Sequence, residues 1–230
     1  MIKKFLLFIL SSGLFFLFVV FSYLVHKNIF TQLDFDTTVR LQNLIPRRLD
    51  FFFSLFSIFG GFEFSTIVLF FLVGIFVLFR KKILAILWIG LYGAFHVFEL
   101  FGKTYVEQAP PSHFLLRTVH PVDFPQFYVS TDFSYPSGHS GRTVFFLTIL
   151  LLTTWRNNKL TLFSKLLCTS VLLGYGGIML VSRVYLGEHW LTDVIAGSIV
   201  GSSFGIAAYL LISVSFNFKR LSPKTLFFRE

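Results

Sequence analysis

Long apolar stretches, separated by polar or charged segments, run along almost the whole sequence. A single α-helix needs about 20 apolar residues to cross the hydrocarbon core of a bilayer. Six stretches come close to this length: residues 5–25, 62–79, 83–101, 140–155, 160–181 and 190–214. The pattern predicts an all-α polytopic membrane protein with six transmembrane helices in one bundle. Because no internal repeat or low-complexity linker interrupts the sequence, we expect residues 1–230 to form a single membrane-embedded domain.

The first apolar stretch follows Lys3 and Lys4, and in this respect it is similar to a secretory signal peptide. Its 21 residues, 5–25, form a longer run than the roughly 7–15 apolar residues of a signal peptide, and no small-residue cleavage site follows. We therefore interpret it as a retained membrane-spanning helix.

Two segments between the apolar stretches are long enough to have structure of their own. Residues 27–50 fit two interpretations, a helix lying in the membrane interface or a plain connector. Residues 102–139 are rich in proline and aromatic residues, which suits a loop folded against lipid headgroups.

The composition supports a membrane protein. Hydrophobic residues make up 55% of the chain and charged residues only 13%, against about 25% charged residues in soluble domains. The chain has one cysteine, Cys168, which excludes an intrachain disulfide framework and a cysteine cluster for a metal.

The net charge of +9 is distributed in a way that indicates membrane topology rather than nucleic-acid binding. If both termini are cytoplasmic, 12 of the 20 lysines and arginines lie on the cytoplasmic side, in agreement with the positive-inside rule. Of the 11 acidic residues, only Glu230 lies on that side. We therefore expect a multi-pass cell-membrane protein with both termini cytoplasmic, whose partner is the lipid bilayer and not nucleic acid.

Polar residues interrupt the apolar pattern at residues 182–197, which read SRVYLGEHWLTDVIAG. His189 and Asp193 are four residues apart, so on a helix they share a face and can touch. A carboxylate that binds one imidazole nitrogen fixes the tautomer and leaves the other nitrogen free as a nucleophile or base. Arg183, across a short turn, can hold two oxygens of a phosphate in its planar fork. A structural polar pair and an interfacial arginine are the alternative interpretations.

A second polar interruption, Pro-Ser-Gly-His at residues 136–139, directly precedes an apolar stretch. Pro136 and Gly138 predict a sharp turn, and glycine lets backbone amides approach an anion closely. The helix that follows directs its free N–H groups and positive dipole end toward the same place. Ser137 adds a hydroxyl donor, and His139 is placed to give a proton to a leaving oxygen. The alternative is a helix cap with an incidental histidine.

Lys103 follows the third apolar stretch, and Glu99 lies on the same helical face one turn earlier. Lys103 is then either a phosphate-binding residue or an ordinary flanking lysine. The topology derived from loop charges alone places the candidate residues on one membrane face: Lys103, Ser137, His139, Arg183, His189 and Asp193. Two histidines, a carboxylate and several phosphate-binding donors on one face describe phosphoryl transfer through a phospho-histidine.

With these residues the chain resembles the type 2 phosphatidic acid phosphatase superfamily, membrane lipid phosphatases that include undecaprenyl-diphosphatase-like proteins. That family has three motifs in order: Lys-x6-Arg-Pro, Pro-Ser-Gly-His and Ser-Arg-x5-His-x3-Asp. The second motif is intact at residues 136–139, and the third is intact at residues 182–193. The 42 residues between them and the six-helix pattern also fit the family.

The first motif departs from the family pattern, because Pro110 occupies the arginine position that follows Lys103. A proline there removes one phosphate contact. Arg117 and Arg142 are candidates to compensate, and an interfacial role is the alternative for both. The departure concerns substrate class and turnover more than the type of reaction.

The resemblance implies metal-independent hydrolysis of a lipid phosphate or diphosphate, without a cofactor. It implies His189 as the nucleophile, Asp193 as the group that orients it, and His139 as the acid that protonates the leaving group. Four substrate-binding residues are implied around the phosphate oxygens: Lys103, Ser137, Gly138 through its amide, and Arg183. The residues themselves also favour no metal site, since the cationic groups already supply the charge stabilisation that a metal would give.

One packing pattern supports a rigid site. His189, Asp193, Gly197, Gly201 and Gly205 recur every four residues along one stripe of the last helix. Glycines at this spacing let helix backbones approach closely. We therefore expect the stripe to be buried against neighbouring helices.

The leading hypothesis is a lipid phosphatase that works on the extracytoplasmic face while the tail of its substrate stays in the bilayer. A lipid phosphotransferase, which passes the phosphate from His189 to another lipid, is a close variant. A non-catalytic lipid-phosphate binding or transport protein on the same scaffold belongs to a different class. The arginine replaced at Pro110 favours this last alternative, whereas the protonatable histidines argue against it, because anion binding alone does not require them.

Overall fold

The computed structural model describes residues 2–119 and 132–218, and this part of the chain contains helices and no strand. The α-helices are α1 (Ile2–His26), α2 (Thr31–Leu44), α3 (Asp50–Ile58), α4 (Phe62–Leu78), α5 (Lys82–Tyr105), α6 (Gly138–Arg156), α7 (Leu162–Tyr185) and α8 (Leu191–Phe218). Two short 3-10 helices are η1 (Arg47–Leu49) and η2 (His113–Leu115). Residues 120–131 of the predicted headgroup loop and the C-terminal residues 219–230 lie outside the described part.

Each of the six predicted apolar stretches is a helix, namely α1 and α4 to α8. Among the described residues, five helical segments are long and apolar enough to cross a membrane: Ile2–His26, Arg47–Leu78, Lys82–Tyr105, Leu162–Tyr185 and Leu191–Val214. Helix α6 is absent from this set because its first two turns carry the polar sequence GHSGRT. The prediction of an all-α multi-pass membrane protein is confirmed. The count of six spans and the side of the termini stay predictions.

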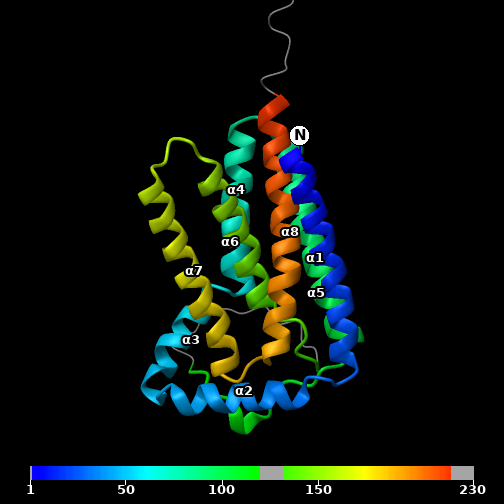
Figure 1. The fold of residues 1–230 in the computed structure, drawn as a ribbon, viewed down its shortest axis with the longest axis vertical. Coiled ribbons are helices and arrows are strands. Elements are labelled where there is room, and N and C mark those ends of the chain that lie inside the picture. Colours follow the sequence, from blue (N-terminus) through cyan, green and yellow to red (C-terminus); the bar gives the residue numbers. More distant parts are fainter. Residues whose placement is uncertain (1, 120–131, 219–230) are drawn as a thin grey trace, which may run out of the picture.

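The long helices run side by side, and their connections alternate between the two ends of the bundle (Figure 1). The N-terminus, the α4–α5 turn and the α6–α7 turn lie at one end, and the α7–α8 turn lies at the other. Helix α2 lies across this second end and packs against α7 and α8. Of the two interpretations of residues 27–50, the helical one is therefore right, while its position in the membrane interface stays a prediction.

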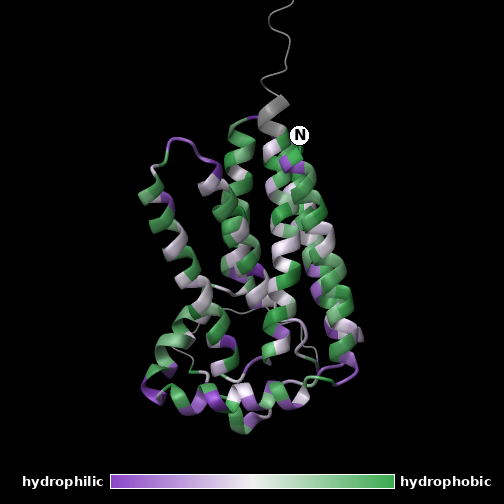
Figure 2. Ribbon diagram, viewed as in Figure 1, coloured by the Kyte–Doolittle hydropathy of each residue, from purple (hydrophilic) through white to green (hydrophobic). Residues whose placement is uncertain are grey.

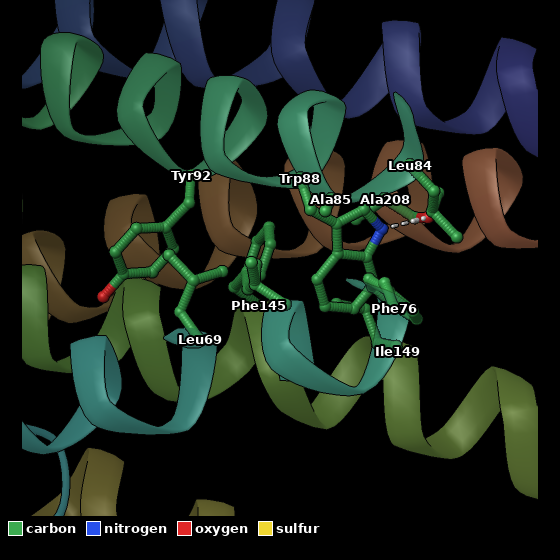
Figure 3. Packing of buried hydrophobic residues seen from close by; sticks show 10 residues of the cluster. Leu69, Phe76, Leu84, Ala85, Trp88, Tyr92, Phe145, Ile149 and Ala208 are labelled. Carbon is green, nitrogen blue, oxygen red and sulfur yellow. Dashed lines mark hydrogen bonds between the residues drawn. The ribbon is translucent and has the colours of Figure 1, made fainter. Parts of the chain in front are cut away.

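The interior joins α4, α5, α6 and α8 around aromatic side chains (Figure 3). Trp88 is buried there, and its indole N–H donates to the carbonyl oxygen of Ala208 at 3.2 Å. A buried indole needs such a partner because the unpaired N–H is costly in an apolar surrounding. The outer surfaces of the long helices are apolar as well (Figure 2), as expected of a protein whose solvent is lipid.

The predicted glycine stripe on α8 packs against the backbone of α6. A Cβ atom at Gly197 would collide with the carbonyl oxygen of Ser137, and one at Gly201 with that of Gly141. At Gly205 it would come within 2.7 Å of the carbonyl oxygen of Phe145. The prediction of a buried stripe is confirmed, and it brings the first turns of α6 and α8 together.

Candidate active site

The turn that contains Pro-Ser-Gly-His begins α6 and is joined to α8. The Ser137 hydroxyl oxygen accepts hydrogen bonds from the backbone N–H (3.4 Å) and the hydroxyl (3.0 Å) of Ser140, so Ser137 caps α6. The backbone N–H of Ser137 donates to the carbonyl oxygen of Asp193 at 3.0 Å. The cap interpretation is thus confirmed, and the same turn lies directly beside the third motif. Its role in binding phosphate stays a prediction.

Gly138 faces a buried ion pair between α5 and α6. A Cβ atom at Gly138 would collide with the carboxylate of Glu99 and would lie 2.7 Å from Nη1 of Arg142. These two groups are 3.1 Å apart. Steric packing therefore favours glycine at this position. The approach of its amide to an anion stays a prediction.

His189 and Asp193 form the predicted pair at the start of α8. The Nδ1 of His189 lies 3.3 Å from Oδ2 of Asp193, and the same oxygen accepts the backbone N–H of Trp190 at 3.0 Å. The Asp193 side chain is fully buried, whereas that of His189 remains 12% exposed. The carboxylate therefore fixes the ring, and the contact to Nδ1 leaves Nε2 for chemistry.

Burial sets the charge state of His189. It lowers the pKa of this imidazole, and the bond and charge of Asp193 only partly oppose the shift. The positive charges of Arg183 and Lys103 lower the pKa further, so it lies below the ordinary value of 6.5. The neutral ring, which carries a free lone pair, is the favoured form at neutral pH.

Arg183 is fully buried at the end of α7, and it has a carboxylate partner that the motif spacing does not predict. Its Nη1 contacts the hydroxyl of Ser57 on α3, and its Nη2 forms an ion pair with Glu188. The other Glu188 oxygen accepts a hydrogen bond from Thr118 at 2.6 Å. A phosphate bound at Arg183 therefore has to share or replace this carboxylate.

His139 and Lys103 complete the group at this end of the bundle. His139 is partly exposed in the first turn of α6, with its Cδ2 facing Gly60. The charges of Arg183, Lys103 and His189 lie close enough to act on its ring. Lys103 is half-buried at the end of α5, where the charges of Glu99 and Asp193 act on it. The structure thus brings all the predicted site residues to one end of the bundle.

Glu99 lies on the same face of α5 as Lys103, but its direct partners are different. Its carboxylate binds Arg142 at 3.1 Å and Nδ1 of His96 at 3.0 Å. Arg142 also donates from Nε to the carbonyl oxygen of Gly60 at 3.2 Å. The contact of Glu99 with Lys103 is therefore electrostatic, and the carboxylate mainly orders Arg142.

The two candidates for the replaced arginine differ in position. Arg142 lies beside Gly138, whereas Arg117 lies over the ring of Tyr185, 5.3 Å from its centroid. Pro110 is exposed and, together with Glu188, lines a cavity of ≈ 430 Å³. Of the two arginines, Arg142 is thus the one placed beside the Pro-Ser-Gly-His turn.

Three further residues of the site became visible only in the structure. Glu188 and Ser57 bind Arg183, and Asp34 of α2 binds the start of α8. Glu188 directly precedes His189 in the third motif, which was the only local signal for it. Ser57 and Asp34 are distant in sequence, so no spacing rule connects them to the motifs.

No group of three His, Cys, Asp or Glu side chains able to hold a metal ion gathers within residues 2–119 and 132–218. The independence from metal that we expect is a statement about the reaction, and it stays a prediction.

Comparisons with known proteins show the family to which the chain belongs. The family model described as the PAP2 superfamily matches residues 81–216, which include both intact motifs. A relative, the undecaprenyl-diphosphatase of Sulfolobus acidocaldarius, is 35% identical over 98 residues, which cover 40% of this chain and 42% of that protein.

Two crystal structures are similar in fold. One is the PAP2-type phosphatidylglycerolphosphate phosphatase of Bacillus subtilis, with a TM-score of 0.64 and 19% identity over 94% of this chain and 98% of that one. The other is LpxE of Aquifex aeolicus, with a TM-score of 0.53 and 25% identity over 76% of this chain and 94% of that one. Since the family match spans more than half of the sequence and contains the joined motifs of α6 and α8, the chain belongs to the PAP2 superfamily.

Proposed function

We propose that the chain is an integral membrane phosphatase that hydrolyses a lipid phosphate or diphosphate on the extracytoplasmic face, through a phospho-histidine and without a metal. One observation carries the proposal. The His189–Asp193 pair is tied, through the Ser137 N–H and the Asp193 carbonyl, to the turn that presents His139. A nucleophile with its orienting carboxylate and a second histidine therefore belong to one rigid unit.

In the first step, Nε2 of His189 attacks phosphorus while the bond from phosphorus to the leaving oxygen breaks. Asp193 stabilises the positive charge that develops on the imidazole ring through its contact with Nδ1. The negative charge of the bound phosphate favours the protonated form of His139. This ring gives its proton to the leaving oxygen, which departs as an alcohol or as a lipid monophosphate. The product is phospho-His189.

The phosphate oxygens gain negative charge at the transition state, and cationic groups of two helices and neutral hydrogen-bond donors of a third stabilise this charge. Lys103 comes from α5, Arg183 from α7, and the Gly138 N–H and Ser137 hydroxyl from the start of α6. Arg183 exchanges its bond to Glu188 for a phosphate oxygen. Donors held by helix ends need little rearrangement as the charge develops, which is the source of their effect on rate.

In the second step, water attacks phospho-His189 and inorganic phosphate leaves. His139, now neutral, accepts the proton of this water, and His189 recovers its lone pair. Both histidines thus return to their starting forms after one turnover.

A lipid is the substrate class that the surroundings of the site support. An apolar cavity of ≈ 390 Å³ is lined by Val184 of α7 and Val194 of α8, each adjacent in sequence to a site residue. The relatives are named for undecaprenyl diphosphate and phosphatidylglycerolphosphate, which both join a phosphate group to an apolar tail. Loop charge supports the extracytoplasmic location, because Arg80, Lys82 and Arg156 lie at the opposite end of the bundle.

The test measures phosphate release by the purified protein from undecaprenyl diphosphate, phosphatidylglycerolphosphate and phosphatidic acid, with and without a chelator. We expect chelator-resistant release from at least one lipid and its loss in His189→Ala. The control is His26→Ala, which makes the same change at the exposed end of α1. Acid-labile label on the wild-type protein, absent from His189→Ala, would identify the phospho-histidine.

The outcomes separate the alternatives. Unchanged release in His189→Ala would reject the mechanism, and loss of release with the chelator would reject metal independence. Label that appears on an acceptor lipid instead of in free phosphate would indicate a phosphotransferase. Binding without release from any lipid would indicate the non-catalytic alternative.

A further inference from the structure

Helix α2 lies across the end of the bundle that carries the site (Figure 1). Two of its polar residues, Asp34 and Thr38, are buried. Asp34 is only 2% exposed. A carboxylate at such depth destabilises the fold unless hydrogen-bond donors surround it. The donors around Asp34 therefore show what this helix holds in place.

Asp34 binds the first turn of α8. It accepts hydrogen bonds from the backbone N–H of Thr192 at 2.9 Å, from the Thr192 hydroxyl at 2.6 Å and from Nε2 of Gln108 at 3.1 Å. Thr192 is the second residue of α8, and the first N–H groups of a helix have no partner within it. Asp34 thus caps α8 from a different helix, with its negative charge at the positive end of the helix dipole.

The capped turn carries the proposed nucleophile. Asp193 follows Thr192 directly, and its own carboxylate binds the N–H of Trp190 and the ring of His189. The two carboxylates therefore satisfy different N–H groups of the same turn, one from within α8 and one from α2.

A second contact from α2 holds the other end of the α7–α8 connection. Nε2 of Gln42 donates to the carbonyl oxygen of Tyr185 at 2.9 Å and to that of Leu115 at 2.6 Å. Tyr185 is the last residue of α7. Helix α2 thus holds both ends of the α7–α8 connection by hydrogen bonds, the start through Gln42 and the end through Asp34.

We infer that Asp34 is a positioning residue for the proposed phosphoryl transfer, which fixes the start of α8 and thereby the His189–Asp193 pair. The inference rests on the proposed function. A nucleophile displaced by about 1 Å loses on the order of 100-fold in rate. The hydrogen-bond partners of Asp34 are Thr192 of α8 and Gln108, so we expect its loss to act on the start of α8 and to leave the phosphate-binding cations in place.

The test compares Asp34→Asn and Thr192→Val with Asp36→Asn. The control makes the same chemical change on α2, where the carboxylate accepts a bond from Gln32 of the same helix at 2.8 Å. We expect Asp34→Asn to lower kcat about 10- to 100-fold with KM nearly unchanged. Amide exchange in a peptide covering residues 186–195 should become faster. The double variant Asp34→Asn/Thr192→Val should lose less than the sum of the single effects on ln kcat, because both changes break one contact.

Wild-type kcat and wild-type amide exchange in Asp34→Asn would overturn the inference. A lower Tm with unchanged kcat per folded molecule would make Asp34 merely structural and would overturn it too. If the wild-type protein releases no phosphate from any lipid, the proposed function fails instead. Amide exchange in Asp34→Asn would then still decide whether α2 holds the start of α8.

Discussion

At the scale of single residues, the reactivity of His189 depends on groups that come from different helices. Asp193 of α8 acts on one side of its ring, Arg183 of α7 and Lys103 of α5 act on it as positive charges, and His139 of α6 lies near it. Only the Asp193 contact favours the protonated ring. Burial, helped by the two positive charges, outweighs this contact, so the pKa of His189 lies below its ordinary value and its lone pair is available.

This balance predicts the acid limb of the pH profile. A proton on His189 abolishes nucleophilic attack, so kcat/KM should fall as the pH falls through the lowered pKa of this ring. Asp193→Asn removes the carboxylate that opposes the shift, which should move the acid limb to still lower pH. The same change should lower the maximal rate by roughly 10²–10⁴-fold, because the ring loses its orienting charge.

The measurement is kcat/KM against pH for wild type, Asp193→Asn and the control Asp36→Asn. An acid limb that stays in place or moves to higher pH in Asp193→Asn would contradict the assignment of His189 as the group that must be neutral.

At the scale of elements, the site depends on how closely α6 and α8 approach. Gly201 faces the carbonyl oxygen of Gly141 with no room for a Cβ atom. The contact lies about three turns from His189 on one helix and two residues from His139 on the other. Separation of the two helices therefore has to move the two histidines relative to each other.

Gly201→Ala should force this separation. We expect the free energy of unfolding to fall by about 1–3 kcal/mol, as in other overpacked interiors, and phosphate release to fall with it. Gly174→Ala is the matched control, since a Cβ atom at Gly174 of α7 meets nothing within 4 Å. Thermal unfolding and activity of both variants check the prediction, and equal behaviour of the two would contradict it.

The sequence predicted well whatever depends on local spacing. Apolar runs gave the long helices, the four-residue spacing gave the His189–Asp193 contact, and the glycine stripe gave a close helix pair. The polar partners that the structure added are long-range. Asp34 is 158 positions away from Thr192, and Ser57 is 126 positions away from Arg183. One sequence contains no periodicity that records such pairs.

Glu188 shows a different limit. It stands directly before His189, yet its role depends on the turn between α7 and α8, where the backbone N–H groups of Glu188 and His189 both reach the Arg183 carbonyl at 3.2 Å. This closed turn folds the carboxylate back onto the guanidinium. The sequence shows that an acidic residue stands at position 188, but it does not show toward which group the turn directs its side chain.

At the scale of the whole molecule, the two ends of the bundle differ in charge and in the groups that they carry. One end carries the α4–α5 and α6–α7 turns with their basic residues, and the other carries the candidate site under α2 (Figures 1 and 2). The positive-inside rule then predicts that the site lies outside the cytosol. A substrate phosphate on that face would reach the site without crossing the bilayer.

This orientation predicts which end of the protein a membrane-impermeant thiol reagent reaches in intact cells. The native Cys168 is first replaced by serine, and single cysteines are then introduced as Ser112→Cys, near the site, and Asn158→Cys, in the α6–α7 turn. Both positions are exposed, so accessibility to the reagent depends on the side of the membrane. Ser112→Cys should react in intact cells and Asn158→Cys only after permeabilisation. The reverse pattern would place the site in the cytosol, and its substrate would then have to be a lipid of the inner leaflet.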